Sequence, residues 1–69
     1  MTQKEKILRH LRDHGSITPM EAMQEYGIMR LAARISDLRR DGVMIDRTMV
    51  SGKNRYGENT SYASYTLAA

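Results

Sequence analysis

The sequence predicts a small α+β fold that is mainly α-helical and carries a β-hairpin in its last third. Two observations predict it. Apolar residues recur at helical spacing through residues 3–41, and the apolar period changes to two after Gly42. A chain of 69 residues has the size of one small domain, so we expect a single domain over 1–69.

The first helix is expected at 3–14. Thr2 followed by Glu5 forms a capping-box pattern, in which each side chain accepts a hydrogen bond from the other residue's backbone N–H. Gly15 supplies the left-handed residue that commonly ends a helix. The apolar residues of this segment fall on one stripe: Ile7, Leu8 and Leu11.

A second, shorter helix is expected from Pro19 to about Tyr26, after a short extended link at 16–17. Thr18 and Glu21 repeat the capping box, and Pro19 takes the first helical position, where its missing N–H costs nothing. Methionine adapts to irregular gaps, so three methionines are expected in the core: Met20, Met23 and Met44.

A third helix is expected at 28–41, between a sharp turn at Gly27 and a stop at Gly42. Its apolar residues recur at spacings of three and four, with Ala32 beside them: Ile28, Leu31, Ile35 and Leu38. At about 100° per residue, a different set falls on the opposite side, with Arg34 on the flank: Met29, Arg30, Ala33, Ser36, Asp37 and Arg40.

Two antiparallel strands should follow, at 43–50 and at 62–67, joined by a polar loop at 51–61 that contains two glycines and two asparagines. Alternation along the second strand places Tyr65 in the core and Tyr62 on the other face.

The basic residues concentrate in the last two thirds of the chain. Eleven Lys and Arg against eight Asp and Glu give a net charge of +3. Residues 1–27 hold four of each sign, 28–41 hold four basic and two acidic residues, and 42–69 hold three and two. Eight of the eleven basic residues are Arg, which suits planar contacts with phosphate or guanine. A solvated surface is the plain alternative for such a pattern.

One stretch resembles a known family. Ile17-Thr18-Pro19-Met20-Glu21-Ala22, followed by Tyr26-Gly27-Ile28 and by Leu31-Ala32-Ala33-Arg34-Ile35-Ser36-Asp37-Leu38-Arg39, is similar to the small winged helix-turn-helix domains of phage and prophage proteins. The similarity covers roughly residues 4–50. It implies a winged helix-turn-helix with three helices and a two- to three-stranded antiparallel wing.

The resemblance also implies binding to double-stranded DNA by a small transcriptional regulator of a phage or mobile element. The segment 28–41 would be the recognition helix in the major groove, and the wing at 51–60 would lie along the flanking backbone or in the minor groove. The residues implied to contact DNA are Met29, Arg30, Ala33, Arg34, Asp37, Arg40, Lys53, Asn54, Arg55 and Tyr56. Asp37 would either accept from a cytosine amine or pair with neighbouring arginines, and pairing with Arg34 and Arg40 is the expected state of the free protein.

Other functions stay open at this point. A winged helix can bind a host or phage protein instead, and Met29 and Met49 would suit an apolar protein contact. RNA binding through the same face is a third possibility. Nothing after Leu67 provides a dimerisation helix, so we expect a monomer or a weak homodimer.

Several classes are disfavoured. The chain has no cysteine, which removes disulfides and thiolate chemistry and suits a cytoplasmic protein. His10 and His14 have a spacing that can hold a metal, but exposed helix polarity explains them better without a third ligand. No apolar run approaches the roughly 18 residues of a membrane span. We therefore expect no enzyme, metal, cofactor, small-molecule substrate or membrane partner.

Overall fold

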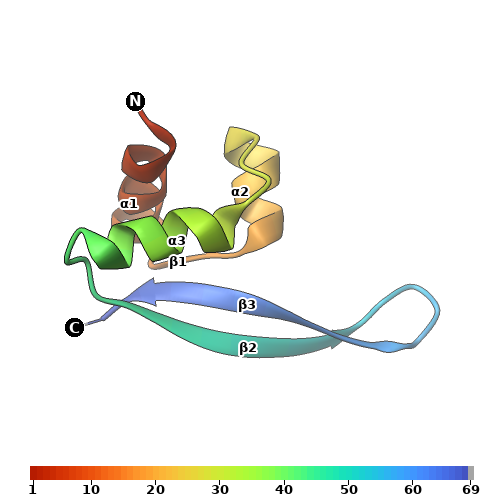
Figure 1. Ribbon diagram of the computed structural model, residues 1–69. Coiled ribbons are helices and arrows are strands. Elements are labelled where there is room, and N and C mark those ends of the chain that lie inside the picture. Colours follow the sequence, from red (N-terminus) through yellow and green to blue (C-terminus); the bar gives the residue numbers. More distant parts are fainter. Residues whose placement is uncertain (69) are drawn as a thin grey trace.

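The computed structural model describes residues 1–68 and confirms the predicted α+β fold. In chain order, its elements are α1 (Gln3–His14), β1 (Ser16–Ile17), α2 (Pro19–Tyr26), α3 (Leu31–Arg40), β2 (Ile45–Lys53) and β3 (Asn59–Leu67). Figure 1 shows the helices gathered on one side of the β2–β3 hairpin, which projects well past them. This projection gives the molecule a long axis of 39 Å, against 25 and 21 Å in the other directions.

The sheet has three antiparallel strands in the order β1-β3-β2. β2 and β3 pair along their whole length, from Ile45 opposite Leu67 to Lys53 opposite Asn59. The short β1 pairs only with the end of β3, where Ser16 lies opposite Thr66 and Ile17 lies opposite Tyr65. β3 is thus the central strand near the helices, and the hairpin continues beyond β1 as a two-stranded ribbon.

The strands are longer than predicted, and the predicted loop at 51–61 shrinks to residues 54–58. Asn54 explains the tight turn. Its side-chain Oδ1 accepts from the backbone N–H of Tyr56 at 2.9 Å and of Glu58 at 3.1 Å, and its own N–H donates to the Glu58 carbonyl at 3.0 Å. Asparagine commonly closes turns in this way. The polar residues on either side therefore continue the ladder, since strand pairing uses backbone groups and does not require apolar side chains.

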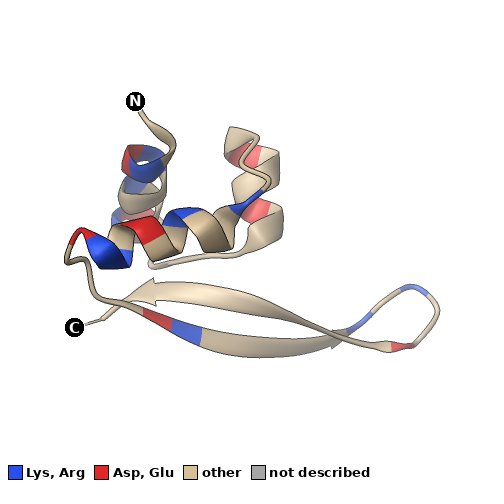
Figure 2. Ribbon diagram, viewed as in Figure 1, with Lys and Arg blue, Asp and Glu red and all other residues tan. Residues whose placement is uncertain are grey.

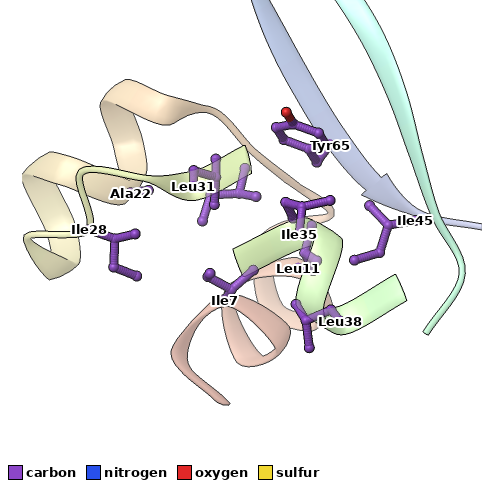
Figure 3. Close-up of a cluster of buried hydrophobic side chains, with 10 residues drawn as sticks. Ile7, Leu11, Ala22, Ile28, Leu31, Ile35, Leu38, Ile45 and Tyr65 are labelled. Atoms are coloured by element: carbon purple, nitrogen blue, oxygen red, sulfur yellow. The ribbon is translucent and has the colours of Figure 1, made fainter. Parts of the chain in front are cut away.

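The core lies where α1, α3 and the sheet meet. Figure 3 shows side chains from all three converging around Ile35, including Leu11, Ile45 and Tyr65. The buried apolar residues are Ile7, Leu11, Ile17, Ala22, Ile28, Leu31, Ile35, Leu38, Ile45 and Tyr65. Leu8 and Leu67 are partly buried and pack against this cluster. The predicted apolar stripes of the first and third helices are confirmed.

The predicted burial of three methionines is wrong. Met20, Met23 and Met44 are 69%, 50% and 73% exposed. Helix α2 contributes a single buried residue, Ala22, and the chain then buries Ile28 just after the helix. A small Ala side chain lets the helix backbone lie close to the core, so the longer methionines on either side of it remain outside.

His10 also departs from its predicted exposed position, because it is only 5% exposed. Its Nδ1 shares a hydrogen bond of 2.7 Å with Tyr26 Oη, which joins α1 to the end of α2. His10 lies one turn beyond the buried Ile7, on the same helix face, whereas His14 stays exposed. Within residues 1–68, no group of three potential metal-ligating side chains comes together. No helix there is both long and apolar enough to span a membrane.

Candidate nucleic-acid interface

The turn between α2 and α3 sets the direction of the third helix. Gly27 makes the predicted sharp turn, with a φ of 67°, a left-handed conformation that glycine adopts without strain. The Gly27 N–H donates to the Met23 carbonyl at 2.9 Å and the Ile28 N–H donates to the Ala22 carbonyl at 3.1 Å, which closes α2. The chain then stays non-helical through Arg30, whose φ and ψ are −121° and 62°. α2, the turn that begins at Gly27 and α3 therefore form a helix, a glycine turn and a second helix.

The third helix therefore begins at Leu31 rather than at residue 28, and it ends at Arg40. Met29 and Arg30 precede it, in the exposed turn at its N-terminus. Unlike the first two helices, α3 has no side-chain hydrogen bond at its N-cap, where Arg30 stands. The prediction extended the apolar period to Ile28, which is indeed buried but belongs to the turn.

The outer face of α3 differs in part from the predicted one. Ala32, Ser36 and Arg40 are exposed, whereas Ala33 and Arg34 are half-buried. Ala32 was expected beside the core and Ala33 opposite it. This burial pattern shows that α3 is rotated about its own axis relative to the prediction, so that its Arg34 side turns toward the core. Ala32 and Ser36 therefore lie next to each other on the exposed side, where both side chains are small. Sequence periodicity alone does not fix this rotation, because it depends on which neighbour each flank meets.

Asp37 pairs with two arginines. Its Oδ2 lies 3.3 Å from Arg34 Nε, and its Oδ1 lies 3.1 Å from Arg40 Nη2. This is the pairing expected for the free protein. Ion pairs at i,i+3 on a helix surface contribute only about 0.3–0.5 kcal/mol, so a phosphate can compete for either guanidinium.

Arg39 has a positioning role that the sequence did not indicate. Its Nε and Nη2 donate to the Ile45 carbonyl at 3.2 and 2.8 Å, which links the last turn of α3 to the first residue of β2. No local pattern marks this contact, because it depends on how the hairpin leaves the helix.

Arg47 is a second residue that the prediction missed. It lies directly opposite Tyr65, so both residues lie on the same face of the sheet, the face that packs against the helices. Strand alternation places Met49 and Lys53 on that face as well. Arg47 itself is exposed. Continuing the period of two from Ile45 through Arg47 would have found it.

The hairpin tip carries the other predicted contacts. Lys53, Arg55 and Tyr56 are exposed, and Tyr56 is 78% so. Asn54 is exposed too, but its side-chain oxygen is engaged in holding the turn. The structure thus gives Asn54 a role in shaping the tip, while the residues beside it present their side chains to solvent.

Basic residues without an acidic partner lie around α3 and along the hairpin. Within residues 1–68, five such residues are found there: Arg30, Arg39, Arg47, Lys53 and Arg55. Of these, Arg39 is engaged with the Ile45 carbonyl. Figure 2 shows basic residues at both ends of α3, on β2 and at the hairpin tip. On α1, Lys4 forms an ion pair of 2.7 Å with Asp41, whereas Lys6 and Arg12 have no acidic partner within residues 1–68.

The arrangement of a helix, a glycine turn, a second helix and an antiparallel hairpin beside it is matched by a known family. The family model of a winged helix-turn-helix domain covers residues 2–69. The chain belongs to this family. No curated protein matches the chain. In winged-helix terms, α2, the turn at Gly27 and α3 form the helix-turn-helix, and the β2–β3 hairpin is the wing. Domains of this family are typically nucleic-acid-binding modules without enzymatic activity.

Proposed function

We propose that this winged helix binds duplex DNA, with α3 in the major groove and the wing on the flanking backbone or in the minor groove. The observation that carries the proposal is a set of four basic residues around α3 and along the wing. Within residues 1–68 they have neither an acidic partner nor, unlike Arg39, a side-chain hydrogen bond: Arg30, Arg47, Lys53 and Arg55. Cations that are not already neutralised can replace the counterions of DNA, which is the main source of affinity.

The dimensions of the molecule support this proposal. A helix with its side chains is about 10–12 Å across, and the major groove of B-DNA is about 12 Å wide. Ala32 and Ser36 on the exposed side of α3 leave room for close approach to the base edges. The long axis of 39 Å compares with roughly 34–36 Å for one turn of DNA, so a helix and a wing tip can reach neighbouring grooves.

Each predicted contact residue then has a role. Arg30, at the uncapped start of α3, reads guanine or holds a phosphate, and Met29 and Ala33 meet thymine methyl groups. Arg34 and Arg40 leave their ion pairs with Asp37 and bind DNA phosphates instead. The Asp37 carboxylate can then accept a hydrogen bond from a cytosine amine.

At the wing, Lys53, Arg55 and Tyr56 contact the backbone, and Asn54 keeps the tip in shape. Arg47 is added to the predicted set, because it lies on the wing face that is directed toward α3.

Within this proposal, the protein acts as a small transcriptional regulator of a phage or mobile element. This role rests on the resemblance of residues 17–39 to the domains of such proteins. DNA is favoured over RNA because the major groove of an A-form RNA helix is too deep and narrow to admit α3.

The direct test is a fluorescence polarisation assay with the full chain and labelled random-sequence duplexes of DNA and of RNA, at about 50 and 200 mM salt. The proposal predicts binding to DNA that weakens steeply with salt, with a slope near −0.9 per phosphate contact. Absence of DNA binding at the lower salt concentration, or tighter binding to the RNA duplex, would contradict it.

A further inference from the structure

An apolar groove lies beside the helix-turn-helix and shares only Met29 with the proposed DNA contact. Its volume is about 610 Å³, and it runs between α2, the turn before α3 and strand β3. Met20 and Met23 of α2, Met29 of the turn and Tyr62 of β3 line it. All four side chains are 46% or more exposed, so they form a continuous apolar surface in water. Exposed apolar surfaces of this kind mark interaction sites.

The groove borders a free strand edge. β1 pairs only with Tyr65 and Thr66 of β3, and Pro19 then turns the chain away into α2. Along 59–64, β3 has β2 on one side and, within residues 1–68, no strand on the other. Figure 1 shows α2 above this part of β3. A free edge presents unpaired backbone N–H and C=O groups that can accept another strand.

The charge beside the groove is acidic. α2 carries Glu21 and Glu25 and no basic residue among its eight residues. Figure 2 shows only acidic colouring on this helix. Glu21 lines the groove, and its carboxylate also accepts from the Thr18 backbone N–H at 3.1 Å. An occupant that fits this wall carries positive charge.

From these three features we propose that the groove binds an extended segment of a partner protein, in which apolar residues alternate with Lys or Arg. The segment continues the line of β1, pairs antiparallel with β3 over 59–64, and places its apolar side chains among Met20, Met23 and Met29. Strand addition supplies affinity through backbone hydrogen bonds, and the pockets for alternate side chains supply specificity. Methionine side chains adapt to different apolar residues, which suits recognition of a sequence class.

The proposal is tested by selecting a displayed library of random dodecapeptides on the immobilised full chain, in the absence of DNA. We expect enriched peptides that alternate apolar and basic residues. Binding of a selected peptide should slow hydrogen exchange at backbone amides within 60–64, because added strand hydrogen bonds protect them. Enrichment of no peptide, or binding without protection in β3, would overturn the proposal.

Matched variants locate the site. Met20→Ser with Met23→Ser should weaken a selected peptide at least about tenfold, since apolar contact is lost on one wall of the groove. Met44→Ser with Met49→Ser removes two equally exposed methionines elsewhere and should leave affinity within about twofold. Equal loss in both double variants would overturn the proposal. Unchanged melting temperatures in both would show that folding does not explain the result.

Discussion

Arg39 donates two hydrogen bonds from its guanidinium group to the carbonyl oxygen of Ile45, which lies 3.2 Å from Nε and 2.8 Å from Nη2. The contact spans the turn between α3 and β2, so it fixes how the wing leaves the helix that it flanks. Planarity of the guanidinium makes this possible, because two of its N–H groups can converge on one acceptor. The two hydrogen bonds thereby hold α3 and the wing as one surface.

Arg39→Lys should lower the free energy of unfolding by about 1 kcal/mol, because an ammonium group cannot replace the two-nitrogen contact with the Ile45 carbonyl. Urea denaturation measures this. Arg40→Lys is the matched control, since Arg40 is exposed and pairs only with Asp37. Equal stability of the two variants would contradict the positioning role of Arg39.

Ile35→Ala should cost about 2–5 kcal/mol, because Ile35 is 1% exposed and touches side chains from α1 and the sheet. Such a loss is a large part of the stability of a small domain. Thermal denaturation followed by circular dichroism gives the result. Ser36→Ala, the exposed neighbour, should stay within about 0.5 kcal/mol of the parent. An unchanged melting temperature for Ile35→Ala would refute the assigned core face of α3.

Gly27→Ala should destabilise the chain by roughly 1–2 kcal/mol because of its left-handed backbone. A Cβ at this position meets no atom within 4 Å, so the cost comes from the backbone conformation and not from crowding. Gly52→Ala is the control, because a Cβ there also meets open space and its φ is not in the left-handed region. Equal costs at the two positions would contradict this origin.

The pKa of Glu5 should lie below the usual value for a glutamate. The main cause is the hydrogen bond that the Thr2 backbone N–H donates to the carboxylate, and a hydrogen bond with the Thr2 side chain adds to it. A carboxylate with a lowered pKa stabilises the fold above its unfolded pKa, and that contribution is lost as the pH falls through the folded value. NMR titration of the Glu5 side chain measures the pKa. Thr2→Ala keeps the backbone N–H but removes the side-chain contact, so it should raise the pKa in part, and an unchanged pKa in that variant would contradict the contribution of the Thr2 side chain.

Local patterns predicted most of the fold, and contacts between distant elements account for the differences. The capping boxes at Thr2 and Thr18, and the left-handed Gly27, depend on a few neighbouring residues, so the sequence indicated them directly. The position of Arg39 against Ile45 depends on how the chain turns after α3, which no local pattern specifies.

The same distinction applies to the candidate site. The exposed tip residues Lys53 and Arg55 follow from composition, but the rotation that exposes Ala32 and half-buries Ala33 follows from tertiary packing. Met20 shows the reverse error. Its type suited a core, yet Ala22 occupies the inner side of α2 and Met20 lines an open groove.

The central claim is that the surface formed by α3 and the wing binds duplex DNA. It is tested most directly by comparing two double variants with equal charge loss, Lys53→Ala with Arg55→Ala at the wing and Lys6→Ala with Arg12→Ala on α1. Within residues 1–68, none of these four side chains forms an ion pair. Binding to random-sequence duplex is measured by fluorescence polarisation across a salt series.

The account predicts that the wing variant binds every duplex more weakly and that its salt slope flattens by about two contacts, whereas the α1 variant retains the parental slope. Arg30→Ala should cost about 1–3 kcal/mol on a preferred sequence and relax the sequence preference. Equal slopes for the wing variant, the α1 variant and the parent would contradict the account.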